Sequence, residues 1–338
     1  MSEQKEIIQV FSGGSCGEPK RLSRPRVSWL NSLAIETQIF GLKPDYRYAV
    51  LGSAQHSLWA YAMFRAQQTQ AFCKGLPLSP RHQLATICAN NISVLYAVTP
   101  LLHTLCRYAD SRDAEVPCVE KIIVGGATWP ESLTLLCQKT FPEAEIICFY
   151  GAAELGYVAH SKPAEPLQSF PQVKIRTDSQ DQLWVRSPLT ICPDDWLASG
   201  DRIAWADTHL GKQDQARFLI LGRVDRVINQ SGVKIQPEPI EEALGLTLDS
   251  SQLALLGRPD PLRGERVTLV LGPELQSRHI EVKEALQNLS CSAAPSLRAA
   301  RLLQINAWPT RSNGKLNLKG LLEEIPKGRP IPQGAFEA

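Results

Sequence analysis

SGDRIAW (199–205) and FLILGRVDRVINQSGVKIQPEPIEEAL (218–244) are the two segments that decide how the rest of the chain is interpreted. They contain short predicted strands, a basic-acidic junction at Arg223 and Asp225, and a loop punctuated by Gly232. A helix follows, with Pro and Glu in its first turn, where both residue types are favoured. This order predicts a nucleotide site at the end of one domain and a hinge directly after it. We therefore expect one domain over residues 1–223, a second over 224–338, and a hinge near Asp225.

Length and composition limit the class of protein. At roughly 150 residues per domain, the 338 residues correspond to about two domains. The net charge of +2 is too small to indicate nucleic acid or an acidic membrane surface as a partner. No apolar run reaches the roughly 18 residues of a membrane span. The start, MSEQKEIIQVF, lacks the long apolar region of a secretory signal. These features predict a cytoplasmic protein.

The nine cysteines do not indicate a metal site. Their number is odd, and none forms a Cys-x-x-Cys pair or a Cys/His cluster with the spacing of zinc ligands. Most lie in apolar surroundings, as Cys148 does in EIICFY, where a free thiol acts as a small core residue. We therefore expect structural thiols rather than metal ligands.

Strands and helices alternate through the first half of the chain. Apolar runs such as YAVLGS, ISVLYAV, KIIVG and EIICFY alternate with helical patterns near 26–40, 57–72, 79–89 and 99–109. This alternation predicts an α/β domain with a largely parallel sheet. After residue 161 the runs VKIRT, QLWVRSP, RIAWAD and RFLILG are spaced like a β meander. The last 110 residues or so predict a small α+β domain with a frayed tail from Pro326.

A glycine-rich loop follows the first predicted strand. The strand at 7–11 leads into SGGSCGEPK, in which the small residues Ser12, Gly13, Gly14, Ser15 and Gly17 precede Lys20. Backbone N–H groups of such residues can converge on an anion, and a lysine adds a point charge. The spacing is not that of a Walker loop, and an ordinary Gly/Ser turn after a strand explains the pattern equally well.

Other candidate positions follow the ends of buried strands. In parallel sheets ligands bind at the carboxyl ends of the strands. His56, Gly125-Gly126 and Tyr150-Gly151 all occupy such positions. For His56 a structural role is the alternative, because a single histidine at a strand end is often structural. The glycine-rich loop falls at the same edge, so the coincidence of several turns favours a ligand site there.

Two carboxylates stand near this predicted edge. Glu154 lies in the turn after the strand that contains Tyr150, and Asp201 follows Ser199-Gly200 in a turn just before a strand. Hard cations such as Mg²⁺ prefer oxygen ligands, and an aspartate can accept hydrogen bonds from a ribose diol. A solvated turn residue is the alternative for each.

Taken together, SGGSCGEPK, IIVGGA, FYGAAE, SGD, LGRVDRVINQSGVKIQPEPIE and PTRSNGK resemble the adenylate-forming superfamily of acyl- and aryl-CoA ligases and adenylation domains. The six motifs occur in the family order over residues 12–315. The resemblance implies a two-step reaction. A carboxylate attacks the α-phosphate of ATP, and a thiol of coenzyme A or of carrier-protein phosphopantetheine then displaces AMP. It implies ATP and Mg²⁺ as cofactors and a small carboxylic acid as substrate.

The resemblance also implies residue roles. Ser12 to Gly17 and Lys20 would cover the β- and γ-phosphates. Gly126 and Ala127 would line the adenine and acyl pockets, with His56 and Gly125 beside the acyl group. Tyr150 would stack on adenine next to Gly151, Glu154 would help to hold magnesium, and Asp201 and Arg223 would bind the ribose. Lys315 would stabilise charge during adenylation, and Asp225 would then turn Gly232 and Lys234 toward the thiol.

The chain departs from the family pattern at three points. Cys16 replaces a hydroxyl residue in the glycine-rich loop, and Ala153 replaces one before Glu154. Only eleven residues precede the loop, where the family has a hundred or more. A second subunit or a homodimer would then supply the missing region. The alternative function is a catalytically weak accessory protein that binds a nucleotide or an acyl group.

Overall fold

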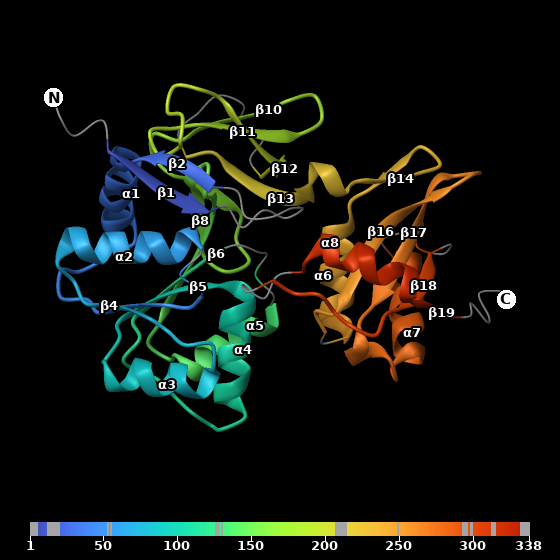
Figure 1. The fold of residues 1–338 in the computed structure, drawn as a ribbon, viewed down its shortest axis with the longest axis horizontal. Helices are drawn as coiled ribbons and strands as arrows, with labels where there is room; N and C mark the ends of the chain where they lie inside the picture. The colour runs from blue at the N-terminus through green and yellow to red at the C-terminus, as the bar shows by residue number, and fades with distance from the viewer. Residues whose placement is uncertain are drawn as a thin grey trace.

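A computed structural model gives the structure of the protein and describes residues 6–11, 21–52, 54, 56–125, 129, 131–206, 215–248, 250–292, 297, 300–311 and 316–331. Two separate sheets, each with its own hydrophobic core, account for most of the chain (Figure 1). The fold is the predicted one: a large α/β part with a β meander, followed by a small α+β part.

An antiparallel hairpin opens the described chain. Strand β1 (Ile7–Phe11) pairs with β2 (Arg21–Pro25), with Phe11 opposite Arg21. Helix α1 (Arg26–Ile39) begins directly after Pro25. The predicted glycine-rich loop joins the two strands, and residues 12–20 lie outside the described residues. The hairpin therefore fixes where the loop begins and ends.

Within the described residues the large sheet has eleven strands, and its first part is parallel. Strands β4, β3, β5, β6 and β7 lie side by side in this order. Their bounds are β3 (Tyr48–Val50), β4 (Cys73–Gly75), β5 (Val94–Val98), β6 (Lys121–Gly125) and β7 (Glu145–Ala152). Helices α2 (Ser57–Thr69), α3 (Pro80–Ala89), α4 (Thr99–Asp110) and α5 (Glu131–Thr140) connect them. Apolar residues of α1 and α2 pack on one face, and those of α3, α4 and α5 pack on the other.

The predicted meander continues the same sheet. Beyond β7 the order is β8, β9, β13, β12, β11 and β10, and every pair is antiparallel. The bounds are β8 (Gly156–Ser161), β9 (Leu167–Ser169), β10 (Lys174–Thr177), β11 (Gln182–Arg186), β12 (Leu197–Trp205) and β13 (Arg217–Arg223). Asp201, expected in a turn before a strand, lies inside β12. The irregular register there explains the turn-like sequence.

The second sheet has six strands in the order β15-β14-β17-β18-β19, with β16 paired to β17. The elements are β14 (Ile228–Gln230), β15 (Val233–Ile235), α6 (Pro237–Leu248), β16 (Leu253–Asp260), β17 (Gly264–Leu271), α7 (His279–Ser292), β18 (Arg301–Gln304), α8 (Leu318–Glu324) and β19 (Arg329–Ile331). The prediction of a tail frayed from Pro326 is wrong for residues 326–331. A 3-10 turn (Ile325–Lys327) and β19 form there, because β18 offers an open edge.

The cysteines differ from the core prediction in part. Cys106 and Cys137 are buried, whereas Cys88 and Cys192 are exposed. These four, together with Cys73, Cys118 and Cys148, are free thiols. Within the described residues no group of three or more His, Cys, Asp or Glu is placed to hold a metal ion. No helix in the same part of the chain is long and apolar enough to span a bilayer.

Candidate functional site

The carboxyl ends of the parallel strands position several predicted site residues at one edge of the large sheet. His56 immediately precedes α2 after β3, Gly125 ends β6, and Tyr150 and Gly151 lie near the end of β7. A Cβ atom at Gly125 would come within 2.8 Å of three ring atoms of Phe149, so the close packing of β6 on that ring requires glycine.

Three predicted residues meet in one cluster. The Tyr150 hydroxyl donates a hydrogen bond to Asp201 Oδ2 at 2.5 Å. Arg223 lies opposite Asp201 in the β12–β13 ladder, and its Nη1 is 3.4 Å from Asp201 Oδ1. Its Nε also donates to Asp225 Oδ1 at 3.2 Å. Residues 73 positions apart in sequence therefore form one polar cluster, which we call the Tyr150 cluster (Tyr150, Asp201, Arg223).

The SGD motif shapes the cluster through its backbone. Gly200 has a φ of +79°, and a Cβ atom there would lie 2.9 Å from both terminal nitrogens of Arg223. A larger residue would therefore be strained and would displace the guanidinium. The Ser199 hydroxyl accepts a hydrogen bond from the Asp201 N–H at 3.0 Å. The sequence thus places glycine and serine where Asp201 and Arg223 must approach each other.

Burial sets the electrostatics of the cluster. Burial raises the pKa of Asp201 above its ordinary value, although the hydrogen bond from Tyr150 and the charge of Arg223 oppose the shift. Burial, together with the charge of Asp201, raises the pKa of Tyr150 well above its ordinary value. Burial tends to lower the pKa of Arg223, but Asp225 and Asp201 outweigh it and the pKa is raised. Arg223 is therefore a permanent cation beside a carboxylate.

Glu154 lies in the β7–β8 turn, at the same edge as the cluster. Its side chain is half-buried, and its carbonyl oxygen accepts a hydrogen bond from the Ile191 N–H at 3.0 Å. The preceding carbonyl, that of Ala153, accepts a hydrogen bond from Arg24. The turn is thus fixed by bonds from two distant segments of the chain.

The other predicted residues fall into two groups. Gly232 and Lys234 lie on the β14–β15 hairpin of the second sheet, where Gly232 has a φ of +83° and Lys234 is exposed. The remainder lie outside the described residues, namely Ser12, Gly13, Gly14, Ser15, Cys16, Gly17, Lys20, Gly126, Ala127 and Lys315. Their roles stay predictions.

The junction between the two sheets carries contacts that sequence reasoning missed. The 3-10 turn Val224–Arg226 joins β13 to β14. Gln236 Nε2 donates to the Arg223 carbonyl at 3.0 Å, and the Arg223 N–H donates to Glu238 Oε1 at 3.2 Å. A Cβ atom at Gly222 (φ +138°) would lie 2.4 Å from the side chains of both Gln236 and Glu238. Gln236, just before α6, and Glu238, in its first turn, therefore hold the strand that carries Arg223.

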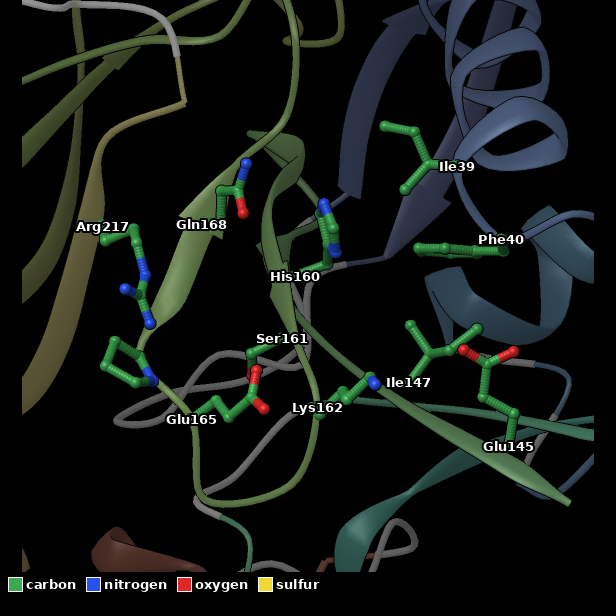
Figure 2. Close-up of a pocket in the computed structure, with 11 residues that line it drawn as sticks. Ile39, Phe40, Glu145, Ile147, His160, Ser161, Lys162, Glu165, Gln168 and Arg217 are labelled. Atoms are coloured by element: carbon green, nitrogen blue, oxygen red, sulfur yellow. The ribbon is translucent and has the colours of Figure 1, made fainter.

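A cavity of about 380 Å³ lies at the opposite end of β7 and contains none of the predicted site residues. Figure 2 shows Ile39, Phe40 and Ile147 on one side of it and Gln168 and Arg217 on the other. It lies where β7 begins and β8 ends, away from the carboxyl ends of the parallel strands. We therefore place the candidate site at the Tyr150 cluster and not at this cavity.

Comparisons with known proteins agree with this fold. A sequence model described as "AMP-binding enzyme" matches residues 4–179. The chain is 28% identical over 289 residues to an uncharacterized acyl-CoA ligase, YhfT, of Bacillus subtilis, covering 78% of the chain and 58% of that protein. It is 22% identical over 337 residues to a 3,4-dihydroxybenzoate–[aryl-carrier protein] ligase of Bacillus anthracis, covering 96% and 74%.

A solved structure gives the same result. The O-succinylbenzoate coenzyme A synthetase MenE of Bacillus subtilis, in complex with ATP and magnesium ion, superposes with a TM-score of 0.75 at 16% identity. The match covers 93% of this chain and 69% of that one. The fold is therefore that of the adenylate-forming enzymes. Because the family model matches more than half of the residues, the chain belongs to the AMP-binding enzyme family.

Proposed function

We propose that the protein activates a carboxylic acid with ATP and transfers the acyl group to a thiol. In the first step a carboxylate oxygen attacks the α-phosphorus of ATP, giving an acyl-adenylate and pyrophosphate. In the second step a thiol attacks the acyl carbon, the acyl–oxygen bond breaks, and a thioester, AMP and a proton result. The ligase names of the relatives support this reaction class.

The Tyr150 cluster is the observation that carries the proposal. The hydroxyls of a ribose diol can donate to a carboxylate and accept from a neighbouring donor, and Asp201 and Arg223 provide both groups. The Tyr150 ring is held beside them by its bond to Asp201, where its face can stack on a purine. A nucleoside therefore matches the chemistry of the cluster better than an inorganic ion does.

Glu154 fits the magnesium ion that the reaction class implies. Mg²⁺ is commonly bound through one or two carboxylates together with substrate phosphates, and it keeps several waters. The half-buried carboxylate of Glu154, in a turn held by hydrogen bonds, meets that requirement. Bound there, the ion would neutralise charge on the phosphates of ATP.

The remaining roles belong to the same proposal. The glycine-rich loop with Lys20 would contact the β- and γ-phosphates, Gly126 and Ala127 would line the nucleotide site, and Lys315 would face the reacting phosphate. His56 and Gly125 would border the acyl group, and Gly232 and Lys234 would border the thiol. Coenzyme A and carrier-protein phosphopantetheine are both compatible acceptors.

Two further expectations concern the whole protein. The chain spans 58% of the length of the YhfT protein and about 70% of the other proteins compared. We propose a second subunit or a homodimer as a partner, and light scattering after size-exclusion chromatography tests it. Activity in the cytoplasm, where ATP and coenzyme A are plentiful, is part of the same proposal.

Carboxylate-dependent exchange of labelled pyrophosphate into ATP, measured across a panel of acids, tests the proposal. We expect exchange with at least one acid, and we expect Lys315→Ala to reduce it by ~10²–10³ because placed positive charge stabilises such transition states. Lys319→Ala is the matched control, since Lys319 is exposed on α8 and should leave the rate unchanged. Binding of AMP with exchange no faster than without protein would instead support the accessory role.

A further inference from the structure

Arg24 is a buried arginine that is hydrogen-bonded to the turn carrying Glu154. It lies on β2, opposite Ile8 in the hairpin that leads into and out of the glycine-rich loop. Only 1% of its surface is exposed, although arginine is almost never fully buried without a charged partner. Among the described residues, no carboxylate lies within ion-pair distance of it. Such burial requires a structural reason.

Two backbone carbonyl oxygens accept hydrogen bonds from the Arg24 guanidinium. Its Nη1 donates to the Ala153 oxygen at 2.5 Å, and its Nη2 donates to the Leu189 oxygen. The Nε atom has no hydrogen-bond partner within the described part of the chain. Arg24 therefore links β2 to the β7–β8 turn and to the loop before β12, using the planar fork that distinguishes arginine from lysine.

The turn that Arg24 holds is built around it. Gly156 has a φ of +70°, and a Cβ atom there would lie 2.4 Å from the Leu189 oxygen and 2.6 Å from Arg24 Nη2. On the far side, the Ile191 N–H donates to the carbonyl oxygen of Glu154. The carbonyl oxygens of Ala153 and Glu154 are thus both hydrogen-bonded, and these bonds restrict the backbone at Glu154.

The charge of Arg24 acts on the same turn. Burial lowers the pKa of Arg24 to about 10, while the charge of Glu154 acts to raise it. Arg24 therefore remains a cation at neutral pH. A buried cation that bonds only neutral carbonyls keeps its charge available to an anionic group at this edge of the sheet.

We propose that Arg24 is a positioning residue for the proposed adenylation reaction, because its two bonds fix the turn that aims the Glu154 carboxylate at the magnesium–phosphate group. This inference rests on the proposed function of Glu154. It assigns a task to strand β2, which holds the β7–β8 turn in place through Arg24.

The magnesium dependence of pyrophosphate exchange tests the inference. In Arg24→Met we expect the magnesium concentration for half-maximal exchange to rise ~10-fold or more, since residues that orient metal ligands typically contribute 10–100-fold to affinity. The KM for the acid should stay unchanged. In Arg24→Lys, which keeps the charge but loses the planar guanidinium, the magnesium concentration for half-maximal exchange should lie between those of the parent and of Arg24→Met. Arg21→Met is the matched control, because Arg21 lies on the same strand, is exposed, and donates a hydrogen bond to exposed Gln9 within the described residues.

A double-mutant cycle with Glu154→Gln separates positioning from general weakening. If Arg24 acts through Glu154, adding Arg24→Met to Glu154→Gln should raise the magnesium requirement no further. Independent, additive effects in the cycle would overturn the inference. An equal loss of magnesium and acid affinity in Arg24→Met would do so as well, since it would indicate only a looser fold.

Hydrogen exchange gives a readout that does not depend on activity. The amides of Leu155 and Ile191 are bonded within the clamped region, to the carbonyls of Ala152 and Glu154. In Arg24→Met, or in Arg24→Lys should the first variant not fold, they should exchange at least ~10-fold faster than in the parent, with β16 and β17 unchanged. Unchanged hydrogen-exchange protection of these two amides would show that Arg24 does not hold the turn. If the parent protein shows no pyrophosphate exchange with any acid, the proposed function is wrong. The hydrogen-exchange measurement would still test whether Arg24 holds the turn.

Discussion

In the proposed function, Asp201 would bind a nucleoside without giving up its present partners. Tyr150 uses one lone pair of Oδ2 and Arg223 approaches Oδ1, whereas an ionised carboxylate offers about four acceptor positions. The hydroxyl of Tyr150 thus orients the ring without filling the carboxylate. Within the cluster, the tyrosine ring and the aspartate charge have separable roles.

Substitutions of Tyr150 separate these roles. Tyr150→Ala should raise the KM for ATP by roughly 10-fold or more, because stacking of a base on an aromatic ring contributes about 1–3 kcal/mol. Tyr150→Phe keeps the ring and loses only the bond to Asp201, so its KM should rise by no more than about 5-fold. Steady-state exchange rates measure both. Equal effects of the two substitutions would contradict a stacking role for the ring.

The protonation state of Asp201 predicts a pH dependence. Since burial raises its pKa, the ionised form that accepts ribose hydroxyls is lost at a higher pH than for an ordinary aspartate. Adenosine affinity, measured by calorimetry, should weaken as pH falls toward that raised pKa. Asp201→Asn should bind ~10–100-fold more weakly at neutral pH, because hydrogen bonds to charged groups contribute about 1.5–3 kcal/mol. The variant should also lack this pH-dependent component, and retention of it would exclude Asp201 as its source.

At the scale of elements, a buried charged network holds the helices on the large sheet. Glu36 of α1 is fully buried, and its Oε1 lies 2.7 Å from Arg65 Nε of α2. The hydroxyl of Tyr157 on β8 donates to Glu36 at 2.9 Å, and that of Tyr96 on β5 lies at 3.2 Å. One carboxylate thus joins two helices to two strands of the sheet that carries the candidate site.

Removing either charge should destabilise this layer strongly. Arg65→Met should lower the free energy of unfolding by about 3–5 kcal/mol, since it leaves Glu36 buried without a cation. Adding Glu36→Gln to it should restore part of the loss, because the uncompensated charge is removed. Urea unfolding of the two single variants and the double variant measures the coupling. Additive losses would show that the two side chains do not interact.

Local sequence patterns carry much of the information about these elements. The parallel strands β3, β5, β6 and β7 and their helices were predictable because apolar runs of strand length alternate with helical periods, whereas the short β4 (Cys73–Gly75) has no such run and was missed. The irregular register inside β12 was not, since SGD has the composition of a turn and only its pairing with β13 makes it a strand. Strand β19 was missed for the same reason: its pairing with β18 is long-range.

For the candidate site, too, local sequence motifs were predictable and long-range contacts were not. Motif residues such as Tyr150 and Asp201 have recognisable neighbours, so the sequence marks them as candidates, and the structure brings them into contact. Arg24 does not. Its one signal is the alternation in RLSRP, where it shares a strand face with Leu22, and alternation cannot say what a buried arginine contacts. The contacts of Gln236 and Glu238 with Arg223 likewise require the three-dimensional path of the chain.

At the scale of the whole molecule, the two sheets meet through the short turn that contains Asp225. If this turn is the hinge, Asp225→Pro should affect the two half-reactions unequally, because a fixed φ hinders one of the two orientations. We expect pyrophosphate exchange and thioester formation from preformed acyl-adenylate to change by factors that differ ~10-fold or more. Stopped-time assays of each step measure them. Equal changes would place the hinge elsewhere.

Oxygen transfer from the acid to AMP tests the central claim most directly. The proposed reaction joins a carboxylate oxygen to the α-phosphorus of ATP and then breaks the acyl–oxygen bond, which leaves that oxygen on AMP. With an acid labelled by ¹⁸O in both carboxylate positions, a thiol acceptor and Mg-ATP, mass spectrometry should find one ¹⁸O in each AMP formed. AMP without label, or label in inorganic phosphate, would contradict the account.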